Sequence, residues 1–322
     1  MNIQTINFCS RKKNGNNHTK YYPPQIQAGY QPSNETMVEE AQMAINQASK
    51  ITKNSIAIQE EAKRHIADSE QIQQSTERIL AEIVDTMEYM DFCISERIKE
   101  KTGKFSGKIK LRGKIYNFQI NPQKITITLR TNTGTDVYEV DTNERKLIYC
   151  AKGIKKQGIT TTIDEEYYFS ADVLKKYQAK ISSGNISLID QCFEYKLNRY
   201  DEHFLSRYTS KMLKTADKTT AKEVFEFYGN EELKQYSKSS SKSTAGEITK
   251  EEEYSFSFSD KHLKLFKKDF RKKADCCSSK LCVEYTGENN FFAQANYNSS
   301  TTPEYSAICF YQNGNIEGSS II

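Results

Sequence analysis

The stretch YYFSADVLKKY, which runs from Tyr167 to Tyr177, shows the pattern that decides the fold. Three aromatic residues are followed by a short polar turn, and the chain then resumes with Leu174, two lysines and Tyr177. Elsewhere beyond residue 103 apolar and polar residues alternate, as in Phe225-Glu-Phe227. Alternation with a period of two is typical of β-strands that bury one face. The stretch is therefore predicted to be a β-hairpin.

This unit recurs along the chain as an aromatic residue, any residue, a second aromatic, a polar turn, then Leu, two residues and Tyr or Phe. The clearest further copies are Phe193-Glu-Tyr195 with Leu205 to Tyr208, Phe225-Glu-Phe227 with Leu233 to Tyr236, and Phe256-Ser-Phe258 with Leu263 to Phe266. More degenerate copies flank these on both sides. The spacing of roughly 25 to 35 residues is in the range of tandem architectures, and we expect about eight consecutive hairpins.

The preceding segment, residues 33–102, has a different texture, because it contains neither Gly nor Pro and is rich in Ala, Gln, Glu, Ile and Lys. This composition predicts one long helix, which Gly103 ends. Apolar residues recur at every seventh position rather than at a period of 3.6, which is typical of a helix in a coiled coil. The candidate oligomerisation seam is Ile51, Ile58, His65, Ile72 and Ile79.

A companion column of mostly small residues, such as Ala48, Ser55 and Ala62, would allow another element to approach this seam closely. The stripe must be covered either by another chain or by the rest of this one, and the pattern leaves both open. We interpret His65 as a polar seam position that sets register, with a pH-sensing role as the alternative.

Together these patterns predict a segregated α+β fold: a long N-terminal coiled-coil-like helix, then an antiparallel β-meander in residues 103–322. Consecutive hairpins need no crossover helix, and so many strands would curl into a curved sheet or a β-solenoid-like form. Residues 1–32 carry Arg11, Lys12, Lys13 and Lys20 without any acid, and we expect them to be a disordered basic arm.

Composition narrows the classes of partner and location. The 46 basic and 42 acidic residues nearly balance, which argues against a dedicated nucleic-acid binder. No apolar run approaches the ~20 residues of a membrane span. Since no signal peptide opens the sequence, we expect a cytoplasmic protein, with signal-independent secretion as the alternative.

The sequence does not carry the usual signatures of catalysis. It contains no G-x-S-x-G, H-E-x-x-H, Walker or G-x-G-x-x-G motif, and its four histidines share no pattern. The eight cysteines are sparse, and we interpret most as core thiols. Acidic runs such as Asp164-Glu-Glu166 stand at strand entrances, where charge discourages edge pairing. We therefore expect no enzyme activity, no cofactor and no metal.

Regularly spaced aromatics suggest the candidate interaction surface. Tyr177, Tyr208 and Tyr236 are either a packing ladder inside the sheet or exposed platforms on which sugar rings could stack. The basic residues between each Leu and Tyr would project from the opposite face or the turn, where they could meet an acidic partner. The surface is completed by Lys175, Arg207 and Lys234.

Over residues 104–322 the chain resembles the tyrosine-rich YD repeats of bacterial Rhs-type proteins, which also pair an aromatic strand, a polar turn and a Leu strand. The usual turn glycine occurs here only at scattered places such as Gly229, Gly287 and Gly314. The resemblance implies a non-catalytic β scaffold and transfers no functional residues.

The sequence thus predicts a structural or interaction protein in which a coiled-coil stalk presents an elongated β-repeat scaffold to a macromolecular partner. The partner would be another protein, or a second copy bound through the helix. The alternative is an adhesin or effector module that binds carbohydrate or a cell surface through exposed tyrosines.

Overall fold

A computed structural model describes residues 34–95, 105–132, 134–144, 146–155, 161–183, 187–214, 218–244, 247–273, 277–287, 290–298, 305–312 and 315–321. The described chain is one helix followed by antiparallel strands, as predicted. The helix α1 spans Asn34–Ser95, and the predicted arm 1–32 and residues 96–102 lie outside the described residues. The chain divides into two compact units, and each is described by itself.

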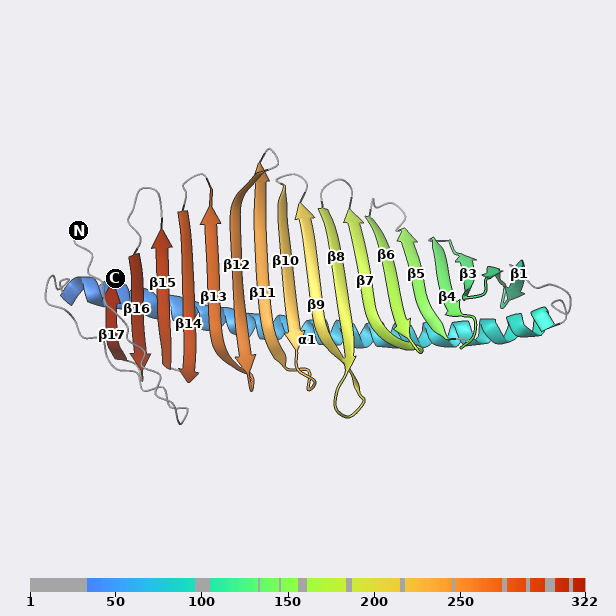
Figure 1. Ribbon diagram of the computed structural model, residues 1–322, viewed down its shortest axis with the longest axis horizontal. Helices are drawn as coiled ribbons and strands as arrows, with labels where there is room; N and C mark the ends of the chain where they lie inside the picture. Colours follow the sequence, from blue (N-terminus) through green and yellow to red (C-terminus); the bar gives the residue numbers. More distant parts are fainter. Residues whose placement is uncertain are drawn as a thin grey trace. The chain divides into compact units, whose positions relative to one another are not determined.

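The central unit, Glu60–Lys234, contains the second part of α1 and the first ten strands. These strands are β1 (Phe105–Leu111), β2 (Lys114–Ile120), β3 (Lys124–Arg130), β4 (Thr135–Asp141), β5 (Leu147–Lys155), β6 (Thr161–Ser170), β7 (Val173–Ser183), β8 (Ser187–Leu197), β9 (His203–Lys214) and β10 (Thr219–Phe227). Each strand pairs antiparallel with the next, and the sheet stays open (Figure 1).

The terminal unit joins Met1–Gln59 to Gln235–Ile322. Its strands are β11 (Leu233–Thr244), β12 (Glu247–Ser259), β13 (His262–Lys272), β14 (Cys277–Gly287), β15 (Asn290–Asn298), β16 (Tyr305–Gln312) and β17 (Asn315–Ile321). The first two residues of β11 belong to the central unit. Consecutive strands again pair antiparallel. The antiparallel succession of strands is therefore confirmed in both units.

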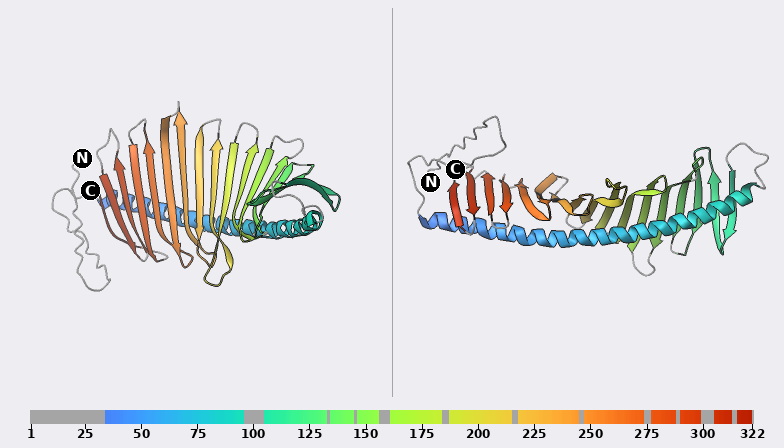
Figure 2. Two further views of the ribbon diagram at one scale, coloured as in Figure 1. Left: turned by 45° about the vertical axis from the view of Figure 1, so that its right-hand side comes forward. Right: turned by 90° about the horizontal axis from the view of Figure 1, so that it is seen from below.

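In each unit the local part of α1 lies along one face of the strands (Figure 2). In the terminal unit the Tyr285 hydroxyl donates to the Ala48 carbonyl at 3.4 Å, and the Gln59 amide donates to the Lys261 carbonyl at 3.2 Å. In the central unit the His65 ring stacks on Tyr208 with 3.7 Å between ring centroids. The apolar stripe of the helix is thus covered within its own chain.

The predicted oligomerisation seam is corrected by this packing. Ile51, Ile58 and Ile79 are buried in the single chain, while His65 and Ile72 are partly buried. The small column is buried as well, since Ala48, Ser55, Ala62, Ser69 and Thr76 are at most 5% exposed. A stripe with a seven-residue period rotates slowly around a straight helix, and a naturally twisted sheet presents a partner surface that also rotates. The same pattern therefore suits a sheet as well as a second helix.

The Leu-x-x-Tyr part of the repeat has a structural explanation. Leu174 and Tyr177 are both buried although a spacing of three would place them on opposite faces of a regular strand. The pairing steps from Tyr168 opposite Lys176 to Phe169 opposite Leu174, so Lys175 is an extra residue in a β-bulge. The same shift occurs after the β8–β9 turn, between Tyr195 opposite Leu205 and Glu194 opposite Arg207. The bulge restores one buried face.

Tight turns join several of these hairpins. Ala171 and Asp172 have φ values of 53° and 65°, and Asp260 and Lys261 have 51° and 64°. Positive φ at both central residues is the geometry of a type I′ turn, whose twist matches that of the strands it joins. The Asp172 carboxylate also accepts a hydrogen bond from the Leu147 backbone N–H at 2.7 Å, which fixes this turn against β5.

Candidate functional site: the two faces of the sheet

The three tyrosines predicted as an interaction surface are buried. Tyr177, Tyr208 and Tyr236 are 7%, 3% and 3% exposed. In the central unit the first two belong to a row of buried side chains, mostly aromatic, that crosses neighbouring strands on the helix-bearing face. Its members, in strand order, are Tyr138, Cys150, Tyr167, Tyr177, Phe193, Tyr208 and Phe225. Adjacent rings such as Phe193 and Tyr208 make edge contacts at 4.8 Å. The packing interpretation applies, and the exposed platform is corrected.

The basic residues between Leu and Tyr do not form a free basic stripe. Arg207 lies opposite Glu194 on one side and Glu226 on the other. Lys175 occupies a bulge and is only partly exposed, whereas Lys234 is exposed. Arg207 is therefore balanced by acids on the sheet itself, which weakens the case for an acidic partner at this point.

His65 has an unusual environment for a polar side chain. Its ring stacks on Tyr208 and makes an edge contact with Phe225. Neither ring nitrogen has a hydrogen-bond partner, and Nδ1 lies 3.8 Å from the Asp68 carboxylate. Burial lowers the pKa of His65, although the carboxylates of Asp68 and Glu223 oppose this shift. The neutral imidazole is consequently the form that fits the core.

The acidic run Asp164-Glu-Glu166, expected at a strand entrance, lies inside β6 and serves both faces of the sheet. Glu165 accepts hydrogen bonds from the hydroxyls of Tyr167 and Tyr177, at 3.2 and 3.0 Å, on the helix-bearing face. Its neighbour Glu166 accepts from Tyr149 and Tyr168, at 3.3 and 2.9 Å, on the opposite face. Successive residues of a strand point to opposite faces, so two adjacent carboxylates each fix a tyrosine pair.

The pair on the opposite face is one that the sequence analysis did not identify. Tyr149 and Tyr168 lie directly across from each other with 5.3 Å between ring centroids. Both are partly exposed, and the Lys176 ammonium lies 5.2 Å from the centroid of the Tyr168 ring. Burial and Glu166 raise the pKa of Tyr149 to about 12, so both phenols stay protonated and donate to the carboxylate. The sequence did contain a signal for this pair. Tyr168 follows Tyr167 directly, so the alternation of a strand places the two on opposite faces of the sheet.

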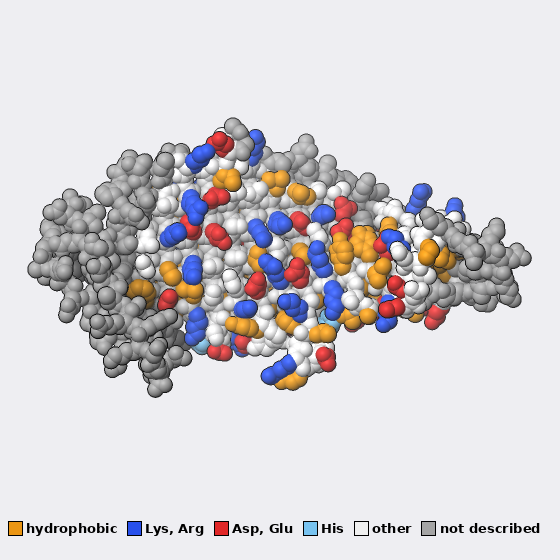
Figure 3. Space-filling model, viewed as in Figure 1, with side chains coloured by type: hydrophobic (Ala, Val, Ile, Leu, Met, Phe, Trp, Pro, Cys, Tyr) orange, Lys and Arg blue, Asp and Glu red, His pale blue; other side chains and the backbone are white. Residues whose placement is uncertain are grey.

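These tyrosines stand in a row that we name the Tyr149/Tyr168 row, made of Glu139, Tyr149, Tyr168 and Lys176 on four consecutive strands. No helix of the described chain covers this face, which we name the helix-free face (Figure 1). Figure 3 shows the same face, with hydrophobic side chains gathered over part of the central unit beside charged ones. The row therefore has an aromatic centre with an acid at one end and a base at the other. Within the chain the Glu139 carboxylate already pairs with the Lys124 ammonium, and Lys176 lies opposite Glu194 on β8.

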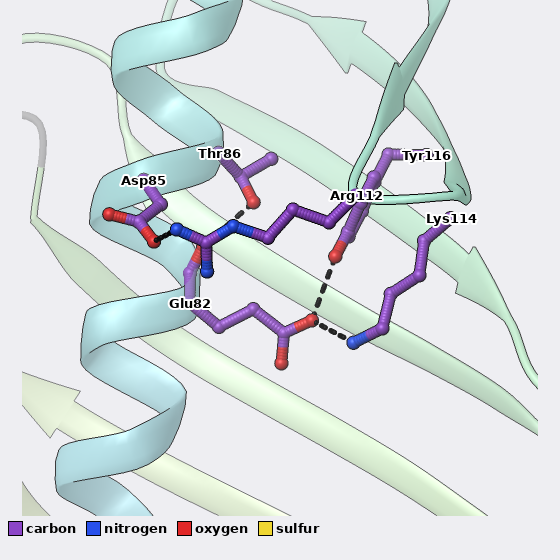
Figure 4. A network of polar contacts seen from close by, with 6 residues as sticks. All are labelled: Glu82, Asp85, Thr86, Arg112, Lys114 and Tyr116. Carbon is purple, nitrogen blue, oxygen red and sulfur yellow. Dashed lines mark hydrogen bonds and ion pairs between the residues drawn. The ribbon is translucent and has the colours of Figure 1, made fainter.

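A polar cluster on the helix-bearing side holds α1 to the first hairpin of the central unit (Figure 4). Glu82 accepts from the Lys114 ammonium at 2.7 Å and from the Tyr116 hydroxyl at 2.8 Å, and Asp85 pairs with Arg112 at 2.8 Å. Burial by itself raises the pKa of Glu82, but these two hydrogen bonds outweigh it and hold the pKa below its usual range. We interpret this cluster as a clamp.

The terminal unit has a hollow of about 340 Å³ on its helix-free face. Its lining is polar and carries both signs of charge; it includes Glu253, Lys267, Asp269, Lys280, Gln294 and Asn296. Lys280 lies 3.9 Å from Asp269, so part of this charge is already compensated. The hollow selects no single class of ligand.

Three of the described thiols are protected rather than activated. Burial raises the pKa of Cys150 to about 12 and also raises the pKa of Cys192 and Cys282. A thiolate is the reactive form, so these cysteines behave as small apolar residues. Within the described ranges no three His, Cys, Asp or Glu side chains gather as metal ligands.

The described part of α1 is not apolar enough along any membrane-spanning length to cross a bilayer. No protein-family model matches this sequence, and a search of curated proteins finds none that is similar to it.

Proposed function

We propose that this chain is a non-catalytic interaction protein that contacts a macromolecular partner through the helix-free face of its central unit. The observation that carries the proposal is the Tyr149/Tyr168 pair, because two partly exposed aromatic rings are held side by side by one carboxylate. Tyrosine is enriched at protein interfaces, and side chains that are already ordered lose little entropy on binding.

We place the contact with the partner on the sheet instead of on the helix seam. The stalk hypothesis assigned the stripe of Ile51, Ile58 and Ile79 to a second chain, but these side chains are buried by their own unit. A coiled coil formed with another copy would need other helix residues, such as the exposed Ile56 and Val84. The expected array of about eight hairpins and the proposed resemblance to YD repeats both favour a scaffold role.

The raised thiol pKa values support a non-catalytic role, since the buried cysteines lack the nucleophile that a cysteine enzyme needs. The carboxylates of Glu165 and Glu166 are engaged by tyrosine hydroxyls, which argues for a structural use of the acidic run.

Site-specific photo-crosslinking tests the proposal. A benzophenone amino acid replaces Tyr168 in one variant of the full chain and Val84, exposed on α1, in a matched control. In cells that express the protein natively, we expect a crosslinked adduct from position 168 and none from position 84. Adducts only from position 84, or from neither position, would contradict the proposal.

A second candidate is carbohydrate binding at the same tyrosines, favoured by the fixed hydroxyls and by the Lys176 ammonium beside the Tyr168 ring. A glycan array probed with the full chain and with Tyr168→Ala tests it: binding that disappears in the variant supports this function. Substitution of Tyr208 or Tyr236 would test packing instead, because both are buried.

A further inference from the structure

We propose that the partner of the helix-free face is a second copy of this chain, packed face to face about a two-fold axis. The axis runs parallel to the strands and passes between β5 and β6 of both copies. This inference rests on the proposed function, and it names the partner that the Tyr149/Tyr168 row fits.

The Tyr149/Tyr168 row is complementary to itself. From β4 to β7 it reads Glu139, Tyr149, Tyr168, Lys176. A two-fold axis parallel to the strands reverses strand order, so the second copy presents a base over the acid and an acid over the base. Tyr149 of each copy then faces Tyr168 of the other. A closed dimer with isologous contacts requires a patch that matches itself in this way.

The adjacent row and the flanking positions permit the same packing. One step along the strands the outward residues are Val137, Ala151, Glu166 and Gln178, and reversal places Gln178 over Val137 and Glu166 over Ala151. The flanking positions of the main row add Thr126 on β3 and Glu194 on β8, which would face each other. None of these facing positions opposes two like charges, which would disfavour association. Lys124 pairs with Glu139 inside each chain, so Lys176 of the second copy would join this pair, and Glu194 of the second copy, over Thr126, would supply a further acid beside it.

The other in-plane axis, perpendicular to the strands, fails this criterion. It preserves strand order, so Glu139 would face Glu139 and Lys176 would face Lys176 where the row lies on the axis. Of the two orientations only the reversed one pairs opposite charges, and the orientation therefore follows from the row itself.

The chemistry of the row is that of a small interface, with an aromatic centre and a charged rim. Aromatic side chains near the centre of an interface carry most of the binding energy, and rim charges contribute orientation and salt dependence. We therefore expect a dimer that the tyrosines hold together and the Glu139 and Lys176 charges align.

Sedimentation velocity of the full chain tests the proposal with a charge-swap series. Glu139→Lys and Lys176→Glu each place like charges together at two symmetric positions, and each should raise the dissociation constant at least about tenfold. The double variant should bind at least about threefold more tightly than either single variant, because opposite charges again face each other across the interface. Recovery is incomplete because position 139 then repels Lys124 and position 176 repels Glu194 within each chain. Within one chain β4 and β7 are about 14 Å apart, so this recovery cannot come from a contact inside the sheet.

Tyr168→Ala should weaken the dimer about tenfold or more, while Tyr168→Phe, which keeps the ring, should stay within about threefold. Far-ultraviolet circular dichroism checks that each variant folds. If Tyr168→Ala does not fold, the charge-swap series on the surface decides alone.

A chain that sediments as a monomer at about 100 μM, about a hundredfold above a micromolar dissociation constant, overturns the inference. So does a dimer that both charge variants leave unchanged, or one that the double variant forms no more tightly than the single variants do. A monomer whose position 168 still crosslinks to a different protein would overturn the dimer and leave the proposed function standing.

Discussion

Neighbouring residues in a strand of this chain lie in different environments, because successive side chains point to opposite faces of the sheet. Tyr167 is buried under the helix while Tyr168 is partly exposed on the helix-free face, and Glu165 and Glu166 follow them to the same two faces. The role of a tyrosine here depends on its parity in the strand. Composition alone does not reveal that parity.

His65 should make stability sensitive to acid. Its folded-state pKa lies below the ordinary 6.5, because burial disfavours the imidazolium more than Asp68 and Glu223 favour it, and Arg64 adds to the lowering. The unfolded chain therefore binds a proton first as pH falls below about 6.5, and stability is lost from there down to the folded pKa. Thermal melts of the full chain at pH 7.5, 6 and 5 measure this loss.

His65→Phe is the comparison for that experiment. A phenyl ring packed against Tyr208 and Phe225 has no nitrogen to protonate, so we expect a smaller fall in melting temperature between pH 7.5 and 5. Burial also lowers the pKa of His203, so some pH dependence remains in the variant. Equal pH dependence in the two proteins would contradict the role given to His65.

Glu82→Ala should destabilise the protein by about 1–2 kcal/mol, because the buried Tyr116 hydroxyl loses its acceptor. Lys114 is half exposed and can return to water, so it adds little. Urea unfolding followed by circular dichroism measures the change. Glu88→Ala, at an exposed position of the same helix, is the matched control and should stay within about 0.5 kcal/mol.

At the scale of the hairpin, the β-bulge allows the Leu and the Tyr of the repeat to be buried on the same face. The Leu-x-x-Tyr spacing is compatible with one buried face only because an extra residue follows the leucine. A bulge of this kind also increases local twist, which helps a long sheet to avoid staying flat.

Deletion of Lys175 tests this explanation. Without the bulge, Leu174 and Tyr177 cannot both point to the helix-bearing face, so a core residue is exposed or the register of β7 slips. We expect the free energy of unfolding to fall by about 3 kcal/mol or more. Lys175→Ala keeps the residue count and should cost less than about 1 kcal/mol; chemical denaturation of both variants makes the comparison.

At the scale of the whole molecule, each unit has a core that joins α1 to strands far away in the sequence. The contacts of Gln59 with Lys261 and of Ala48 with Tyr285 span 202 and 237 residues. Such non-local contacts close large loops before they stabilise the fold, which predicts slow folding.

Ile51→Asp should loosen the terminal unit, because Ile51 is buried there and a charge in the core is costly. Hydrogen exchange should show loss of protection in β12 to β14 before β6 to β8. Ile56→Asp is the matched control, since Ile56 is 58% exposed on the same helix. Equal loss of protection in both units would contradict the division into two cores.

The local patterns were enough to predict the helix, the period-two strands and their antiparallel succession, because turns and hairpins depend on residues that are close in sequence. They also contained the Leu-x-x-Tyr repeat, although not the bulge that explains it. Residues 1–32 lie outside the described residues, and their predicted disorder stays a prediction.

Those local patterns could not predict which surface covers the apolar stripe of the helix. A row of isoleucines specifies burial and a period, but a neighbouring helix and a twisted sheet satisfy both equally well. The choice depends on contacts such as that between His65 and Tyr208, which folding brings together from distant positions. For the same reason Tyr177 and Tyr208 became core, and the candidate site moved to Tyr149 and Tyr168 on the face that no described helix covers.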